Sequence, residues 1–227
     1  MTVVSTGDAS KALKLTPQRI TELVRAGDLE GTQLSDGTWL VETSSFAAYE
    51  NVRASAGRPW TKHSSWALLY LLSDFEPDQI SATTASRVRR RIRESTATEI
   101  ATKVSKRSAV HHFSSDDREK TARALFLTGR SATDTIETNL AGQNRVVDGY
   151  IRNGTLENFI DKHLLVPDTK GDITIYDRDE STVWKGFYAP RAVVAADLAR
   201  STSTRERSEG LQALDRMRTQ WLSKPTG

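Results

Sequence analysis

The chain has 227 residues, of which 37% are hydrophobic and 27% are charged, a balance typical of a globular protein. Its longest apolar run, Trp66 to Leu72, is far shorter than the roughly 20 residues that cross a bilayer. The first residues lack the pattern of a secretory signal, so we expect a cytoplasmic protein without a membrane partner. The absence of cysteine excludes disulfides, thiol nucleophiles and cysteine-built zinc sites.

The net charge of +3 is unevenly distributed along the chain. Residues 1–56 carry five Lys or Arg against seven Asp or Glu, residues 57–112 carry ten against five, and the remainder is balanced. Electrostatic attraction to a nucleic acid must therefore involve the middle of the chain and not the N-terminal segment alone.

Residues 55–59, Ser-Ala-Gly-Arg-Pro, contain a glycine and a proline that interrupt a helical pattern. We predict a domain boundary here, with one domain over residues 1–56 and a second over residues 57–222. The second divides into a helical, basic part (57–107) and a part of mixed strands and helices (108–222). The predicted fold class is therefore α+β.

The N-terminal domain begins with a short predicted helix that ends near Lys14. Either Ser5 or Thr6 can cap its N-terminus, because both side chains accept a hydrogen bond from a free backbone N–H. The spacing of its small and apolar side chains predicts an inward face formed by Ala9, Ala12 and Leu13.

A second helix is predicted to begin at Thr16 and Pro17. Threonine is a good N-cap, and proline suits the first helical position because its missing N–H loses no intrahelical bond. Gly27 is a plausible residue to end the helix. The apolar stripe consists of Ile20, Leu23 and Val24.

A β-hairpin is predicted to follow, because two apolar stretches, 32–34 and 38–41, flank an Asp36-Gly37 turn signal. Trp39 is predicted to be a core residue. A third helix, capped by Thr43 or Ser44, is predicted to direct Phe46 and Tyr49 toward the same core.

This order of helix, turn, helix, hairpin and helix resembles the excisionase and MerR-type winged helix-turn-helix domain. The resemblance rests on residues 16–20, 23–29 and 37–41. In such domains the second helix enters the major groove of duplex DNA and the hairpin approaches the backbone. The resemblance thus implies that the DNA-binding residues are Thr16, Gln18, Arg19, Thr21, Glu22, Arg25, Ser35 and Thr38.

The chemistry of these residue types suits base recognition. Gln18 can read adenine, Arg19 and Arg25 can read guanine or hold a phosphate, and Glu22 can accept from a cytosine amine. The alternatives are a solvated helix face for each residue and a purely protein-binding role for the domain. Because the domain carries more acidic than basic residues, we expect a homodimer or help from elsewhere in the chain.

An arginine-rich segment in the middle of the chain is predicted to form a helix with Ala85, Val88 and Ile92 on its buried face. Lys103, Lys106 and Arg107 follow it and add to the basic charge. Two interpretations stay open: contact with phosphate or with an acidic or RNA-like partner, and a solvated helix face. The arginines in question are Arg87, Arg89, Arg90, Arg91 and Arg93.

The rest of the chain predicts alternating strands and helices. Strands are expected at residues 109–113, 146–151 and 173–176, and helices at 116–126, 156–163, 190–199 and 204–222. The first of these helices is predicted to be capped by Ser114 or Ser115.

Together with the arginine-rich helix, residues 66–72, 110–113, 147–156 and 189–198 resemble the abortive-infection type IV antitoxin family (AbiEi-like). The resemblance covers most of residues 57–222. It implies an antitoxin that represses its own operon by binding double-stranded operator DNA and that neutralises a nucleotidyltransferase toxin.

No enzyme signature is found, including nucleophile elbow, phosphate loop, dinucleotide fingerprint and zinc-protease motifs. His111 and His112 should point to opposite faces of a strand, and Asp177 to Glu180 is typical of a solvated turn. We therefore expect no catalytic residue, metal or cofactor.

The sequence leaves two further possibilities open. Trp184, Phe187 and Tyr188, with Lys185, are candidates for base stacking, although such aromatics more often form a core or an interface. The alternative function is a transcriptional regulator or excisionase-like protein whose C-terminal domain senses a ligand or partner.

Overall fold

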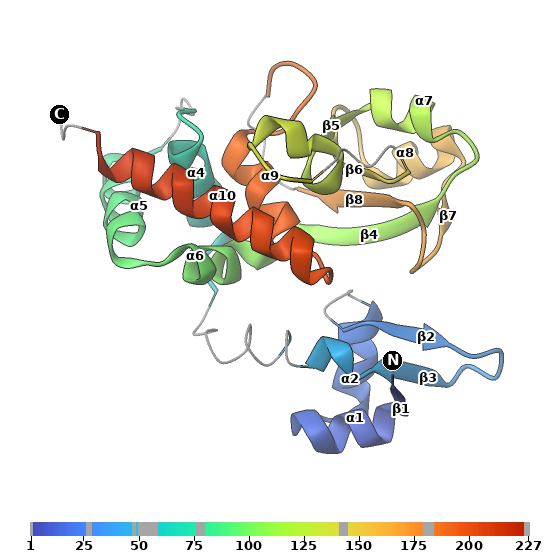
Figure 1. Ribbon diagram of the computed structural model, residues 1–227. Coiled ribbons are helices and arrows are strands. Elements are labelled where there is room, and N and C mark those ends of the chain that lie inside the picture. The colour runs from blue at the N-terminus through green and yellow to red at the C-terminus, as the bar shows by residue number, and fades with distance from the viewer. Residues whose placement is uncertain are drawn as a thin grey trace. The chain divides into compact units, whose positions relative to one another are not determined.

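The structure is a computed structural model that describes residues 2–25, 29–46, 49, 59–75, 80–140, 145–178 and 184–224 (Figure 1). The chain divides into two compact units, Met1–Gly57 and Arg58–Gly227. Each unit contains both helices and strands, in agreement with the predicted α+β class, and each has hydrophobic clusters of its own. No helix within the described ranges is both long and apolar enough to span a membrane.

The helices of the first unit begin where the sequence predicts. The Ser5 hydroxyl accepts from the backbone N–H of Asp8 at 3.1 Å, and Thr16 accepts from the N–H of Arg19 at 3.2 Å. Lys14 adopts a left-handed conformation and ends the first helix. The two helices are α1 (Thr6–Leu13) and α2 (Pro17–Arg25).

A three-stranded antiparallel sheet of order β1-β3-β2 completes the first unit. The predicted hairpin is confirmed: Gly37 takes a positive φ of 86° in the turn, and Thr38 N–H donates to the Asp36 carboxylate at 2.9 Å. The first strand was not predicted, because it has three residues and gains its stability from pairing with β3. The strands are β1 (Val3–Ser5), β2 (Gly31–Gln33) and β3 (Trp39–Glu42).

The core of the first unit lies between α1, α2 and the sheet. Phe46 and Tyr49 pack against it as predicted, whereas Gly27 and residues 47–48 lie outside the described residues. The prediction for Ala12 is wrong, because its side chain is exposed. Helix α1 buries only Ala9 and Leu13, which lie one turn apart on the same face. The buried residues are Ala9, Leu13, Ile20, Leu23, Val24, Leu29, Trp39 and Val41.

The second unit contains a five-stranded sheet of order β5-β6-β8-β4-β7. The pair β6 and β8 is parallel, and the other neighbours are antiparallel. Because side chains alternate along a strand, one face of the sheet packs Ile173 and Ile175 with Phe159 of a covering helix, while Tyr150 and Tyr176 face the larger cluster. The strands are β4 (Ala109–Ser114), β5 (Leu125–Leu127), β6 (Val147–Ile151), β7 (Val166–Pro167) and β8 (Ile173–Asp177).

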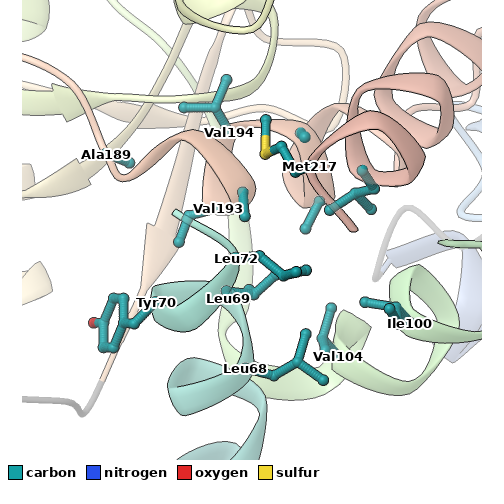
Figure 2. Close-up of a cluster of buried hydrophobic side chains, with 14 of the residues drawn as sticks. Leu68, Leu69, Tyr70, Leu72, Ile100, Val104, Ala189, Val193, Val194 and Met217 are labelled. Atoms are coloured by element: carbon teal, nitrogen blue, oxygen red, sulfur yellow. The ribbon is translucent and has the colours of Figure 1, made fainter. Parts of the chain in front are cut away.

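The larger hydrophobic cluster joins five helices from distant parts of the sequence. Figure 2 shows Leu68 and Leu69 of α4 with Ile100 of α6, Val193 of α9 and Met217 of α10. These side chains are almost fully buried. The helices are α4 (Lys62–Leu72), α5 (Ala82–Glu94), α6 (Ala97–Val104), α7 (Arg118–Arg123), α8 (Leu156–His163), α9 (Arg191–Leu198) and α10 (Thr204–Leu222), with short 3-10 helices η1 (Ser105–Arg107) and η2 (Gly129–Thr135).

The prediction of a helix over residues 116–126 is wrong at both ends. It is the shorter α7, which Asp117 caps by accepting from Lys120 N–H at 2.9 Å. The residues after it form strand β5, whose Phe126 pairs with Tyr150 of β6. Pairing with a buried central strand outweighs the helical periodicity of the local sequence.

Candidate nucleic-acid interface

The outer face of α2 is polar and exposed. Its inner stripe, Ile20, Leu23 and Val24, is buried, as predicted. A helix with one strongly apolar face must present its other face to solvent or to a partner. That outer face carries Gln18, Arg19, Glu22 and Arg25, all exposed.

Two charges on this face form an ion pair with each other. Arg19 Nη1 lies 2.8 Å from Glu22 Oε2, and both side chains are about half exposed (43% and 49%). An exposed pair of this kind contributes little to stability, so rearranging it to meet a base or a phosphate costs little.

The threonines of α2 are engaged with its own backbone. Thr16 caps the helix, and the Thr21 hydroxyl donates to the carbonyl of Pro17 at 3.2 Å. Their observed contacts therefore position the helix, and Thr21 is only partly exposed. The capping role of Thr16 agrees with the prediction from the sequence.

The tip of the β2–β3 hairpin is polar. Ser35 and Thr38 are both exposed, and Gln33 donates from its side chain to the carbonyl of Gly37 at 3.0 Å. The hydrogen bonds from the backbone and side chain of Thr38 lower the pKa of Asp36, which keeps this carboxylate negative. The hydroxyls of Ser35 and Thr38 can approach a phosphate, while Asp36 opposes one.

The five arginines of α5 fall into distinct environments. Val88 and Ile92 are buried and Ala85 is half-buried, as predicted. Arg91 is half-buried with its guanidinium 4.8 Å from the centre of the Trp60 ring, and burial followed by repulsion from Arg87 and Arg90 lowers its pKa.

The remaining arginines of α5 are exposed. The guanidinium of Arg93 lies over the Trp221 ring at 5.7 Å, and Arg90 lies 3.8 Å from Glu94. Arg87 and Arg89 form no ion pair or hydrogen bond within the described part of the chain. These two are therefore the cations of α5 that are most available to an anionic partner.

Arg107 does not belong to a basic surface, although the sequence grouped it with Lys103 and Lys106. Its side chain is fully buried and forms an ion pair with the equally buried Asp197. Burial lowers the pKa of Arg107, but Asp197, Tyr150 and Tyr176 together outweigh burial and hold the pKa above its ordinary value. Tyr150 and Thr128 donate to the same carboxylate at 2.9 and 2.8 Å.

A second polar cluster lies on the same face of the sheet. Arg130 binds Asp148 with two hydrogen bonds, from Nε at 2.8 Å and from Nη2 at 2.7 Å, and it also donates to Thr174 at 3.1 Å. Thr174 lies 3.4 Å from Nδ1 of His112 on the neighbouring strand. Burial, and then repulsion from Arg130, lowers the pKa of His112 below its ordinary value, although Asp148 opposes the shift.

The other candidate residues that the structure describes do not come together in one site. The ring of His111 stacks near that of Phe113, on one face of β4. The ring of His112 lies on the opposite face, next to Thr174. Within the described ranges no group of three His, Cys, Asp or Glu side chains can hold a metal ion, and residues 179–180 lie outside those ranges. Trp184, a base-stacking candidate, is buried and donates from Nε1 to the Tyr70 hydroxyl at 3.1 Å.

Comparison with known proteins gave no match: no family model, curated protein or solved structure is detectably similar to the chain.

Proposed function

We propose that the chain is an antitoxin that represses its own operon, with its first unit acting as a winged helix-turn-helix. The observation that carries the proposal is the division of α2 into a buried stripe and an exposed face bearing Gln18, Arg19, Glu22 and Arg25. In this proposal α2 lies in the major groove of the operator, and the β2–β3 hairpin is the wing.

The first unit by itself supplies few contacts to phosphate. Arg19 shares its charge with Glu22, and the hairpin tip carries the carboxylate of Asp36. Each phosphate contact contributes to affinity through counterion release, so a domain with few free cations binds weakly. We therefore assign supporting phosphate contacts to Arg87 and Arg89 of α5, whose charges are exposed.

The second unit is proposed to neutralise a nucleotidyltransferase-type toxin. The proposal is supported by the resemblance of its sequence to the abortive-infection antitoxins. It is also supported by the separate hydrophobic clusters of this unit, which give it a core without the first unit.

The test of the DNA-binding half is a titration of DNA from upstream of the gene with variants of α2. Arg19→Ala and Arg25→Ala should each weaken specific binding by about 1–3 kcal/mol, or roughly 5- to 150-fold, because each removes a charged contact to a base or phosphate. Lys11→Ala is the matched control, since Lys11 is an exposed cation on α1. Wild-type affinity in both α2 variants would refute the assignment of α2 as the recognition helix.

The test of the antitoxin half is growth rescue. Cells that express the gene adjacent to that of this protein should be arrested, and the chain should restore growth when co-expressed. Operator binding without rescue would instead favour the alternative of a regulator whose second unit senses a ligand or partner.

A further inference from the structure

An ion pair joins two residues of α2 for which the sequence predicts separate contacts with DNA. Arg19 Nη1 donates to Oε2 of Glu22 at 2.8 Å. The two residues are three positions apart, so their Cβ atoms lie about 5–6 Å from each other on one face of the helix. Both side chains are about half exposed. The outer face of α2 therefore presents a bonded pair of opposite charges, and not a cation and an anion that act separately.

The folding of α2 does not account for this pair. Thr16 caps the helix, and its stripe of Ile20, Leu23 and Val24 is buried in the core of the first unit. An exposed ion pair adds little or nothing to the stability of such a helix. The carboxylate of Glu22 also repels DNA, in a unit that carries seven acidic residues against five basic ones. On a DNA-binding helix, recognition is the use that such a carboxylate has.

The base edges of the major groove leave a carboxylate one good partner. Guanine presents the acceptors O6 and N7, and thymine presents the acceptor O4, so these edges repel a carboxylate. Adenine has an amine, but its N7 acceptor lies beside it. The N4 amine of cytosine is a donor without such a neighbour on its own base. A guanidinium has the opposite preference and bonds O6 and N7 of guanine, so a G·C pair suits both Arg19 and Glu22.

The spacing of the two side chains lets them contact one base pair or two successive pairs. Successive base pairs are about 3.4 Å apart along the duplex, which is less than the separation of the two Cβ atoms. The bond to Glu22 also restrains the plane of the Arg19 guanidinium. Bidentate contact with guanine needs that plane to align with the base, so the carboxylate positions the arginine as well as accepting from cytosine.

We infer that Arg19 and Glu22 read a G·C pair as one unit, in which Arg19 bonds the guanine and Glu22 accepts from the amine of its partner cytosine or of a cytosine in the next pair. Breaking the ion pair costs little in water, but in the groove it would leave the carboxylate facing phosphates and base acceptors. Glu22 therefore determines specificity chiefly by weakening binding to other sequences. The inference rests on the proposed function, because it requires α2 to lie in the major groove.

This role predicts that the operator and unrelated DNA respond differently to loss of the Glu22 charge. Glu22→Gln keeps the size of the side chain and removes a negative charge, so affinity for scrambled DNA should stay equal or rise. Operator binding loses the restraint on Arg19 and the charged acceptor for cytosine. The preference for operator over scrambled DNA should therefore fall by at least about tenfold. A residue that only supports the helix would change both affinities alike.

The experiment is a titration of the full chain against DNA from upstream of its gene and against a scrambled duplex of equal composition. Each base pair of the site that footprinting locates is then replaced in turn, with wild type, Glu22→Gln, Arg19→Ala and the double variant. Glu30→Gln is the matched control, because it removes one negative charge from the same unit at a position between α2 and β2. Thermal unfolding followed by circular dichroism verifies that each variant is folded.

The expected result is that both single variants lose discrimination at the same G·C pair, or at that pair and its neighbour, while Glu30→Gln keeps the wild-type preference. Because the two residues act as a unit, the double variant should match the preference of Arg19→Ala within about threefold. An unchanged preference in Glu22→Gln would overturn the inference. Equal weakening on both duplexes, or losses at unrelated base pairs in the two single variants, would overturn it as well.

The wild-type titration separates this inference from the proposed function. A wild type that binds the two duplexes equally contradicts the proposed function and the inference with it. A wild type that prefers upstream DNA, with a Glu22→Gln variant that retains this preference, overturns the inference alone and leaves α2 as the recognition helix.

Discussion

Asp197 joins side chains from distant parts of the second unit. Its carboxylate pairs with buried Arg107 and accepts from Tyr150 and Thr128. Asp197→Asn should lower the free energy of unfolding by about 3–5 kcal/mol, because it leaves the Arg107 guanidinium buried without a counter-charge. Urea denaturation measures the loss. The control is Asp215→Asn at an exposed position of α10, and a loss in the Asp197 variant as small as in this control would contradict the account.

His112 should make the second unit less stable in mild acid. Burial, and then repulsion from Arg130, holds the pKa of folded His112 below its ordinary value of 6.5, so the unfolded chain binds more protons between the two values. Stability is therefore complete above about pH 6.5 and falls as the pH drops below it. His112→Asn should reduce the loss of unfolding free energy between about pH 7.5 and about pH 5.5.

The measurement is a set of urea midpoints across this pH range. His163, whose pKa is also lowered, adds a loss in the same direction that both proteins share. His63→Asn, at an exposed position, is the control. An equally steep decline in wild type and His112→Asn would show that His112 is not a source of the pH dependence.

Residue environments could be predicted where they follow from local spacing. Ile20, Leu23 and Val24 recur at helical intervals, and the structure buries all three. The burial of Arg107 had no such signal, because its partners Tyr150 and Asp197 lie 43 and 90 residues away in the sequence. An arginine flanked by serines and a lysine is expected at the surface, and only the folded structure shows that Asp197 pairs with Arg107.

At the scale of elements, α5 provides a test of phosphate contact. Replacing both Arg87 and Arg89 by glutamine should make the log–log dependence of DNA affinity on salt shallower by about 1.8, since each phosphate contact contributes about 0.9. Preference for the operator over other DNA should survive, because phosphate contacts carry no sequence information.

Arg91→Gln is the matched control for this pair. Arg91 packs over Trp60, so its replacement should reduce thermal stability and leave the salt dependence unchanged. A double variant whose slope equals that of wild type would mean that Arg87 and Arg89 are solvated or contact a different partner.

Elements were predictable where one periodicity extends over enough residues. Helices α8 and α10 match the predicted ranges, as does the hairpin at Asp36-Gly37. Strands β1, β5 and β7 were missed because each has at most three residues and exists through pairing with another strand. The short segment that bridges to Leu127 at Tyr188 has the same origin.

At the scale of the whole molecule, the two compact units should be separable. A fragment that lacks residues 1–56 retains both hydrophobic clusters of the second unit, so it should fold and still rescue growth while losing repression. Circular dichroism establishes folding, and a reporter fused to the upstream DNA measures repression. A folded fragment that fails to rescue would contradict the assignment of toxin neutralisation to the second unit.

In the proposed function the first unit recognises a specific duplex sequence. A competition titration of the full chain measures this recognition, between DNA from upstream of its gene and a scrambled duplex of equal length and composition at one salt concentration. We expect at least about 10³-fold tighter binding to the upstream DNA. Equal affinity for the two duplexes would contradict it, because charge alone would then account for all of the binding.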